Sequence, residues 1–395
     1  MIVPFSVSPL PQIVFGDGSL NQVPSLLQQF GKRVLIVTGG RSFRSSLHWQ
    51  SLIDGLKGRG MSWEDIAVAQ EPSPGLVDQA VRVYRNAGVE MVLGIGGGSA
   101  LDAAKAIAGL LPHNHSVMDF LEGVGPELPY RGPALPFIAV PTTAGTGSEA
   151  TKNAVLSVHG PDGFKKSFRH DLLVAKYAVV DPALLAACPA GLIAANGMDA
   201  LTQLLESFVS TRANPFADAL ALSGLDCVRD GLLEWYEGGE KAAEGRTGMA
   251  YAALLSGITL AQVGLGSVHG LAAPLGAFFP IPHGVACGAT VAAATEINIR
   301  ALEQREPDSP ALEKYARVGR LFRGKTHVDD VGARVFLVHV LKEWTARLKM
   351  PGLGAYGVRE ADLAEIVANS RGSSMKTNPV VLTDGEVREI LLRSL

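Results

Sequence analysis

One carboxylate and two imidazoles in the second half of the chain could hold a metal ion. Asp199 stands in a segment with helical spacing, where Gln203, four residues later, projects from the same face. His269 and His283 each precede a glycine within residues 247–295, which contain no charged residue, and an imidazole is costly there unless it is hydrogen-bonded or metal-bound. Asp199, His269 and His283 would suit a catalytic Zn(II) or Fe(II) that polarises a carbonyl. Taken singly, each histidine is better explained as a satisfied core or helix-end residue.

A glycine-rich turn in the first half could bind a phosphate. The stretch Gly94-Ile-Gly-Gly-Gly-Ser99 follows an apolar run and opens a helical pattern. Backbone N–H groups and the positive end of a helix dipole then converge on one point. Gly96, Gly97 and Gly98 allow a pyrophosphate to approach closely, and Ser99 can cap the helix. The spacing differs from G-x-G-x-x-G, so a plain strand-to-helix turn is the alternative.

A second loop carries hydroxyl groups. Residues 141–149, Pro-Thr-Thr-Ala-Gly-Thr-Gly-Ser-Glu, follow the next apolar run. The carboxyl ends of parallel strands face one crevice, so this loop could hold ribose or nicotinamide. A hydroxyl-rich cap for a following helix is the alternative interpretation.

The elements that must position these loops alternate along the first half. Short apolar runs predict strands over residues 34–37, 66–69, 91–95 and 137–140, with 154–158 and 177–180 as further candidates. Periodic stretches predict helices over residues 75–87 and 99–110. This alternation predicts a parallel sheet with helices on both faces.

The second half of the chain does not alternate. After Asp181-Pro182, long segments rich in Ala and Leu are separated by Gly or Pro, which predicts an all-helical domain. We therefore expect a dinucleotide-binding α/β domain over residues 1–183 and a helical metal- and substrate-binding domain over residues 184–395. The active site would lie in the cleft between them. The uncharged residues 247–295 are interpreted as buried helices lining the site.

Composition narrows the functional classes. The 395 residues include 35 basic and 38 acidic ones, a net charge of -3, so nucleic acid is not expected as a partner. The three cysteines are scattered, which favours a reducing cytoplasm. Residues 1–10 lack the pattern of a secretion signal and are interpreted as an edge strand or arm. No membrane span is expected.

Five stretches along the chain form a set. They are Phe15-Gly16, Gly96-Gly-Gly-Ser-Ala-Leu-Asp-Ala-Ala-Lys105, Pro141-Thr-Thr-Ala-Gly-Thr-Gly-Ser-Glu149, Gly197-Met-Asp-Ala-Leu201, and His269-Gly with Pro282-His-Gly284. Together they resemble the iron-containing (group III) alcohol dehydrogenase family over essentially the whole chain. The resemblance implies a Rossmann-like first domain, a helical second domain, a nicotinamide cofactor and a divalent metal.

The resemblance also implies roles for individual residues. The cofactor's diphosphate region would meet Gly96, Gly97, Gly98, Ser99 and Asp102. The ribose and nicotinamide would lie along Thr142, Thr143, Thr146 and Ser148. Lys165 resembles the lysine that the family directs at the cofactor ribose.

The choice between cofactors depends on the turn after the first main strand. NAD-specific relatives place an acid there to bind the 2′-hydroxyl. Here Gly39 and Gly40 leave room, and Arg41 or Arg44 with Ser42 could bind a 2′-phosphate. We therefore favour NADP(H) over NAD(H), the alternative being that both arginines are simply solvated.

The chain departs from the family pattern at two positions. Gln203 stands where the family has a metal-binding histidine, so we expect Gln203 to be an optional fourth ligand beside Asp199, His269 and His283. Ala273 replaces a further histidine, so no protein general base is assigned.

The expected activity is NAD(P)-dependent interconversion of a small primary alcohol and its aldehyde, assisted by Fe(II) or Zn(II). A homo-oligomer, a dimer or larger, is expected because members of the family form such assemblies. The alternatives are a metal-independent reductase resembling maleylacetate reductases, a lyase resembling dehydroquinate synthase, and a silent cofactor-binding protein. The lyase would need a basic pocket that residues 247–295 do not offer. The apolar residues Leu265, Leu271, Phe278 and Phe279 suggest short aliphatic or aromatic aldehydes as substrates.

Overall fold

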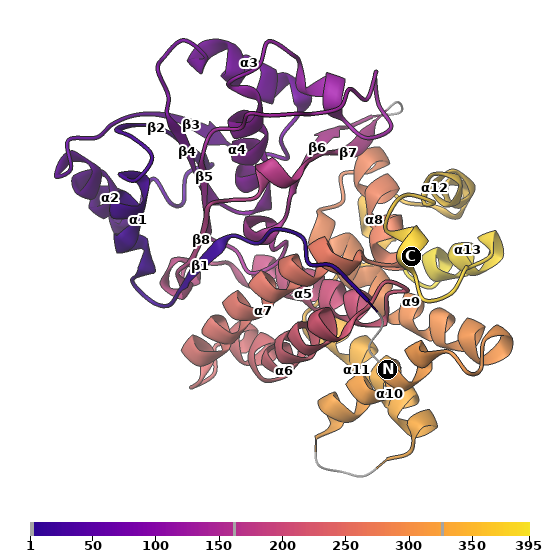
Figure 1. Cartoon of the computed structure of the whole chain (residues 1–395). Coiled ribbons are helices and arrows are strands. Elements are labelled where there is room, and N and C mark those ends of the chain that lie inside the picture. Colours follow the sequence, from indigo (N-terminus) through magenta and orange to yellow (C-terminus); the bar gives the residue numbers. More distant parts are fainter. Residues whose placement is uncertain (1–3, 161–162, 325–327) are drawn as a thin grey trace. The chain divides into compact units, whose positions relative to one another are not determined.

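The computed structural model describes residues 4–160, 163–324 and 328–395, which divide into two compact units (Figure 1). The α/β unit comprises residues 8–158 and 163–187, and most of the helical unit is residues 188–395. Residues 4–7 and 159–160 also belong to the helical unit. The expected domain boundary after residue 183 and the expected cleft stay predictions.

A six-stranded parallel sheet forms the centre of the α/β unit. Its order is β1-β8-β5-β4-β2-β3, and every pairing is parallel. The strands are β1 (Gln12–Phe15), β2 (Arg33–Gly39), β3 (Ser62–Val68), β4 (Met91–Gly96), β5 (Phe137–Pro141) and β8 (Tyr177–Val180). The predicted parallel sheet is confirmed.

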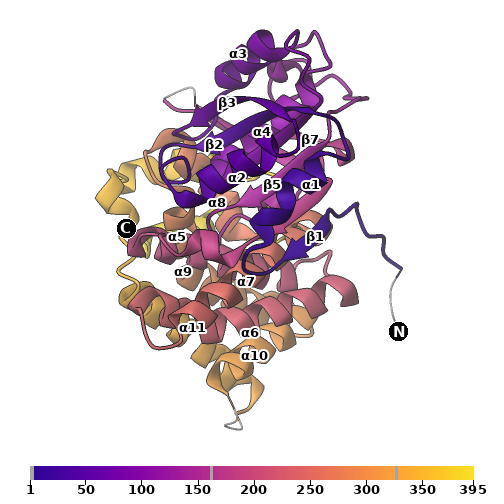
Figure 2. The same ribbon diagram turned by 90° about the vertical axis from the view of Figure 1, so that its left-hand side faces the viewer.

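Helices cover both faces of this sheet, as predicted (Figure 2). They are α1 (Val23–Leu27), α2 (Leu47–Lys57), α3 (Pro74–Tyr84) and α4 (Gly98–Leu110). Because side chains alternate along a strand, Leu35 and Val37 of β2 pack in one core with α3 and α4. Val34 and Ile36 pack in the other core, with α1 and α2. Strands buried on both faces read as continuous apolar runs, which explains why the sequence revealed them.

The candidate strand over residues 154–158 does not join the parallel sheet. It forms β6 (Asn153–Val158), which pairs antiparallel with β7 (Phe164–Arg169) as a separate two-stranded sheet. The N-terminal expectation is also refined, because residues 4–10 contain neither helix nor strand and the edge strand begins at Gln12. Residues 1–3 lie outside the described part of the chain.

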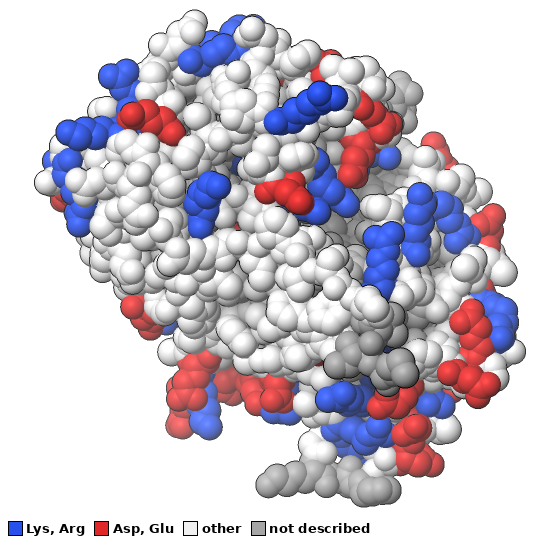
Figure 3. Space-filling view, in the orientation of Figure 1, with Lys and Arg blue, Asp and Glu red and all other residues white. Residues whose placement is uncertain are grey.

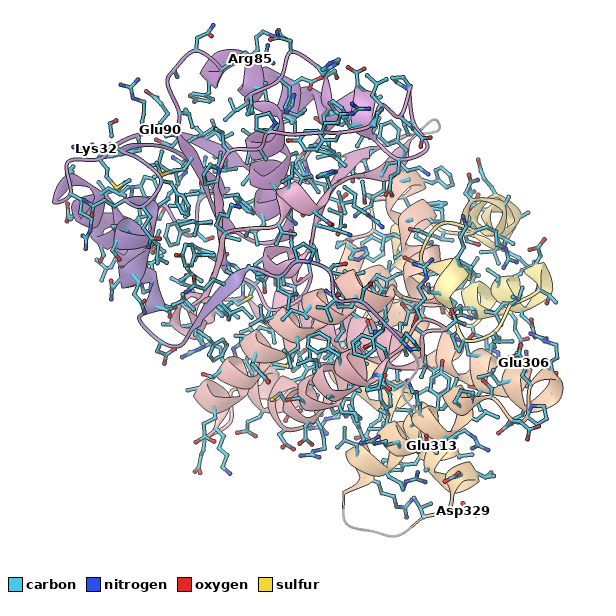
Figure 4. The ribbon with its side chains drawn as sticks, in the orientation of Figure 1. Lys32, Arg85, Glu90, Glu306, Glu313 and Asp329 are labelled. Atoms are coloured by element: carbon cyan, nitrogen blue, oxygen red, sulfur yellow. The ribbon has the colours of Figure 1, made fainter. Side chains whose placement is uncertain are left out.

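The amino ends of β2 and β4 are joined by one carboxylate. Glu90 accepts hydrogen bonds from the N–H groups of Lys32 and Arg33 at 2.7 and 2.9 Å, and Figure 4 shows Lys32 and Glu90 side by side. These bonds lower the pKa of Glu90. The contact helps to fix the register that aligns the opposite, carboxyl ends of the strands.

The second unit is helical, as predicted. Its helices are α5 (Ala190–Val209), α6 (Pro215–Glu237), α7 (Ala242–Val263), α8 (Ser267–Phe278), α9 (His283–Arg305), α10 (Pro310–Arg323), α11 (Asp330–Arg347), α12 (Leu363–Asn369) and α13 (Asp384–Leu392). α6 and α7 approach closely at two glycines, since a Cβ on Gly231 would lie 2.8 Å from the carbonyl oxygen of Gly245. α5 packs against α6, α7 and α9, which places both faces of α5 in the core.

The uncharged residues 247–295 form most of α7, all of α8 and the first half of α9. No single helix in the described ranges is long and apolar enough to span a membrane; α7 and α8 pass that test only as a pair bent by 101°. On the face drawn in Figure 3, acidic and basic side chains are interspersed, and the described residues form no continuous basic track there.

Candidate active site

The carboxyl ends of three neighbouring strands bring the expected cofactor residues of the α/β unit together. Thr38 pairs with Ile95, and Gly96 pairs with Pro141, so β2, β4 and β5 end side by side. The N–H of Thr142 donates to the carbonyl oxygen of Gly96 at 2.9 Å. The glycine-rich turn and the hydroxyl-rich loop therefore share one edge of the sheet.

The glycine turn is packed too tightly for side chains. Gly96 has a φ of +158°, and a Cβ there would lie 2.7 Å from the Cβ of Ala100 and 3.0 Å from the backbone nitrogen of Gly39. A Cβ on Gly98 would lie 2.7 Å from Thr146 Cγ2. Backbone atoms alone can occupy this turn, which is what close approach of a diphosphate requires.

The helix after the turn begins without a side-chain cap. Gly97 is the N-cap residue of α4, and no side chain of the described residues accepts a hydrogen bond from its first turn. Ser99 is the second residue of the helix, so the expectation that Ser99 caps it is wrong. The uncapped N–H groups and the helix dipole together suit an anion.

The hydroxyl-rich loop is fastened to α4 by a buried network. Ser148 Oγ donates to Asp102 Oδ1 at 2.5 Å, and its backbone N–H donates to Thr146 Oγ1 at 3.3 Å. The Lys105 ammonium is fully buried and donates to Ser148 O, Thr151 Oγ1 and Asn153 O at 2.8 to 2.9 Å. Burial lowers the pKa of Lys105 to about 8. Lys105 thus anchors the loop that carries Thr142, Thr143, Thr146 and Ser148.

Lys165 lies on β7 and forms an ion pair with Glu71 at 2.5 Å. Glu71 also accepts a hydrogen bond from Ser157 Oγ at 2.6 Å. Burial raises the pKa of Asp102, and the charges of Lys105 and Lys165 oppose that rise. Lys165 therefore lies within electrostatic range of Asp102, but its ion-pair partner is Glu71, which was not predicted from the sequence.

The turn after β2 contains Gly39, Gly40, Arg41 and Ser42, and the last two are exposed. Arg44 differs from the expectation, because its guanidinium pairs with Asp65 of β3, donates to Thr38 Oγ1 at 2.6 Å and lies over the ring of Trp49. The local sequence shows no acid, but the neighbouring strand supplies one. Of the two arginines considered for a 2′-phosphate, Arg41 is exposed, and its side chain forms no ion pair with the described residues.

In the helical unit, α5, α8 and α9 bring together four side chains of types that can ligate a metal. Asp199, His269, His283 and Cys287 each offer one ligand atom, and these atoms all lie within 4.8 Å of one another. Asp199 Oδ1 is 3.2 Å from His269 Nε2 and 3.7 Å from His283 Nε2. Positions 283 and 287 are four residues apart on α9, so their side chains share a face.

A buried carboxylate orients His269. Glu206 lies two helical turns after Asp199 on α5; its Oε2 is 2.7 Å from His269 Nδ1, and its Oε1 accepts the Val268 N–H at 2.7 Å. Nδ1 thereby donates to Glu206, and Nε2 faces Asp199. An acid that binds the outer nitrogen of a metal-ligating histidine fixes its tautomer and ring orientation. Glu206 was not predicted from the sequence, although it follows Asp199 by seven residues, a spacing that places both side chains on one face of a helix.

The surroundings of the cluster shift the pKa values of Asp199 and His269 in opposite directions. Burial alone would raise the pKa of Asp199, but the charge of His283 and a hydrogen bond from His269 lower it to about 2. Burial alone would lower the pKa of His269, but Cys287, Asp199 and Glu206 raise it well above its ordinary value. Burial raises the pKa of the Cys287 thiol to about 12.

One carboxylate oxygen of Asp199 is buried and accepts no hydrogen bond from the described residues. Its side chain is 1% exposed, and its Oδ2 atom has no hydrogen-bond partner within the described chain. A buried carboxylate oxygen without a partner is costly unless a cation satisfies it. Carboxylate oxygen, imidazole nitrogen and thiol sulfur are also donors that Zn(II) and related divalent ions accept, so these residues fit a metal site.

Gln203 contacts the cluster through the other end of its amide. Its Nε2 donates to Asp199 Oδ1 at 3.1 Å, and its Oε1 accepts a hydrogen bond from Ser256 Oγ at 2.9 Å. The oxygen expected to bind the metal is thus occupied. Leu265 and Leu271, expected to line a substrate pocket, are 3% and 0% exposed and belong to the buried core.

Comparisons with known proteins agree with this geometry. The family model described as iron-containing alcohol dehydrogenase matches residues 11–182, and the model described as Fe-containing alcohol dehydrogenase family, C-terminal, matches residues 193–395. The chain is 32% identical to alcohol dehydrogenase 4 of Saccharomyces cerevisiae, with 97% of each chain covered. It is 28% identical to the NAD-dependent methanol dehydrogenase of Bacillus methanolicus, with 98% of each covered.

A solved structure gives the same picture. An archaeal halo-thermophilic alcohol dehydrogenase from a Red Sea brine pool aligns over 100% of both chains with a TM-score of 0.90 and 28% identity. The glycine turn after β4, the cluster around Asp199 and the match of both family models therefore agree. The chain belongs to the iron-containing alcohol dehydrogenase family.

Proposed function

We propose that this chain transfers hydride between NADP(H) and a small primary alcohol or aldehyde, with a divalent metal held by Asp199, His269 and His283. Membership of the family makes it an NAD(P)-dependent oxidoreductase that acts on CH–OH groups. Two observations carry the metal assignment: the donor atoms of Asp199, His269, His283 and Cys287 cluster together, and Asp199 Oδ2 has no hydrogen-bond partner within the described chain. When bound, a divalent ion stabilises negative charge on the substrate oxygen, and the nicotinamide exchanges hydride with the substrate carbon.

The chain's own residues bind and orient these groups. The N-terminus of α4 and the turn over Gly96–Gly98 bind the diphosphate through backbone N–H groups. Thr142, Thr143, Thr146 and Ser148 line the ribose and nicotinamide, with Asp102 and Lys165 nearby. Glu206 holds His269 in the orientation that presents Nε2. We assign no protein base, because the side chain of Ala273 can neither accept nor donate a proton. Water or a cofactor hydroxyl would then move the substrate proton.

The preference for NADP(H) is proposed from the turn after β2. Gly39 and Gly40 leave space, and exposed Arg41 and Ser42 can bind a 2′-phosphate. Asp65 does not oppose this, because its carboxylate is already paired with Arg44. We also propose a homo-oligomer in the cytoplasm, where Cys188, Cys227 and Cys287, all free in the structure, stay reduced.

The test is NADPH oxidation over a panel of small aldehydes with the wild-type protein and Asp199→Asn. Asparagine keeps the size of the side chain but removes the charge, so activity should fall by at least about 100-fold if the ion supplies several kcal/mol of stabilisation. Asp308→Asn, at an exposed position of the same unit, is the matched control. Equal activity of wild type and Asp199→Asn would refute the metal role and favour a metal-independent reductase.

A further inference from the structure

The thiol of Cys287 lies among the three residues assigned to the metal. We propose that Cys287 is a fourth metal ligand, that Gln203 is not a ligand, and that the resulting set of one carboxylate, two imidazoles and one thiolate selects Zn(II). This inference rests on the proposed function, in which Asp199, His269 and His283 hold a metal ion.

The separations of the donor atoms match a tetrahedral zinc site. With metal–nitrogen and metal–oxygen bonds of about 2.0–2.1 Å and a metal–sulfur bond of about 2.3 Å, tetrahedral donors lie about 3.4 Å apart when both are N or O, and about 3.6 Å apart when one is S. Cys287 Sγ is 3.6 Å from His269 Nε2 and 3.9 Å from His283 Nε2. Asp199 Oδ1 is 3.2 and 3.7 Å from the same two nitrogens.

The sulfur is held there by rigid elements. Cys287 is 0% exposed, and it lies one helical turn after His283 on α9. Its sulfur contacts the two imidazole nitrogens that face Asp199. A thiol exchanges only weak hydrogen bonds with two Nε2 atoms, whereas a metal ligand needs this position beside both imidazoles.

Gln203 is turned the wrong way for coordination. Its Nε2 donates to Asp199 Oδ1, and an amide N–H has no lone pair to offer an ion. Its Oε1 accepts from the buried Ser256 hydroxyl. Rotating the amide to present oxygen would break both hydrogen bonds inside the core, so Gln203 positions the Asp199 carboxylate instead.

The donor set then decides the metal. A thiolate is a soft ligand, and it favours Zn(II) over Fe(II) relative to an all-oxygen and nitrogen site. Binding breaks the S–H bond and forms a metal–sulfur bond, with one proton released to solvent.

Cobalt substitution tests the proposal without an activity assay. The whole protein, stripped of metal and loaded with Co(II), should show a sulfur-to-cobalt charge-transfer band in the near ultraviolet. Cys287→Ser should bind cobalt without this band. Its zinc affinity should fall by more than about 100-fold, which exceeds the loss of about 10–100-fold that is typical when the hydrogen-bond partner of a ligand is removed. Gln203→Ala should keep the band, and its zinc affinity should fall less than that of Cys287→Ser. Cys227→Ser, on α6, is the matched cysteine control and should keep both.

X-ray absorption of the zinc-loaded wild type removes any dependence on how the variants fold. A sulfur scatterer at about 2.3 Å supports the proposal. Stoichiometric zinc with only nitrogen and oxygen neighbours would overturn the thiolate ligand while leaving the metal-assisted function intact. Failure of wild type to bind zinc or cobalt at all would overturn both. Wild type and Cys287→Ser are then equilibrated with equal amounts of zinc and iron. If both bind the two metals in the same ratio, the proposed zinc preference is overturned.

Discussion

Replacing Glu206 by glutamine should weaken metal binding without touching a ligand atom. Glu206 Oε2 accepts from His269 Nδ1, and Oε1 accepts from the Val268 N–H, each at 2.7 Å. Glutamine has one acceptor oxygen for these two donors. If that oxygen stays with Val268, an NH2 group faces Nδ1, and His269 must move its proton to Nε2, the nitrogen that faces Asp199.

The magnitude follows from the lost orientation. Removing the outer partner of a ligating histidine typically costs about 10–100-fold in metal affinity, which is about 1.4–2.7 kcal/mol. We expect this loss in zinc affinity for Glu206→Gln, measured by competition with a chromogenic chelator. Glu306→Gln, an exposed carboxylate labelled in Figure 4, is the control and should bind zinc as wild type does. An affinity of Glu206→Gln within about twofold of wild type would refute the orienting role.

Three further predictions concern the α/β unit. Burial raises the pKa of the Glu149 carboxyl to about 7 from 4.5, so the protonated carboxyl stabilises the fold fully below pH 4.5, and this stabilisation is lost as pH rises through 7. In urea unfolding, the free energy of unfolding of Glu149→Gln should gain about 3 kcal/mol over that of wild type between pH 5 and 8. No gain would contradict a buried, protonated Glu149. Arg41→Ala should raise the KM for NADPH about 10-fold and leave that for NADH unchanged, since one charge-assisted bond to phosphate is lost; equal effects on both cofactors would exclude a 2′-phosphate contact. Gly98→Ala should weaken NADPH binding in fluorescence titration, because its Cβ would lie 2.7 Å from Thr146 Cγ2, and unchanged binding would show that the turn can yield.

Local sequence predicted the elements that are buried on both sides. The runs that became β2, β4 and β5 are continuous apolar stretches, and each lies between two helical layers that require such a composition. The strand over residues 153–158 could not be placed in the same way. Its pattern is that of any half-buried strand, and the antiparallel partner at residues 164–169 is set by the hairpin and not by the helix alternation.

Local sequence predicted the site less completely, because its contacts span long stretches of chain. Asp199, His269 and His283 were candidate ligands by residue type and spacing, but each histidine alone was better explained as a core or helix-end residue. Glu206 meets His269 across 63 positions, so the pairing has no local pattern. Gln203 was expected to replace an imidazole by residue type, but its amide is oriented by Ser256, which lies 53 positions away. Arg44 was expected to be solvated or phosphate-binding, but Asp65 of the adjacent strand binds it.

Metal analysis of protein purified without chelators, paired with aldehyde-dependent NADPH oxidation before and after stripping, tests the central claim most directly. We expect near-stoichiometric zinc or iron, loss of activity on stripping and its return when the metal is restored. A metal-free protein that reduces an aldehyde at the same rate before and after chelation would contradict the role given to Asp199, His269 and His283.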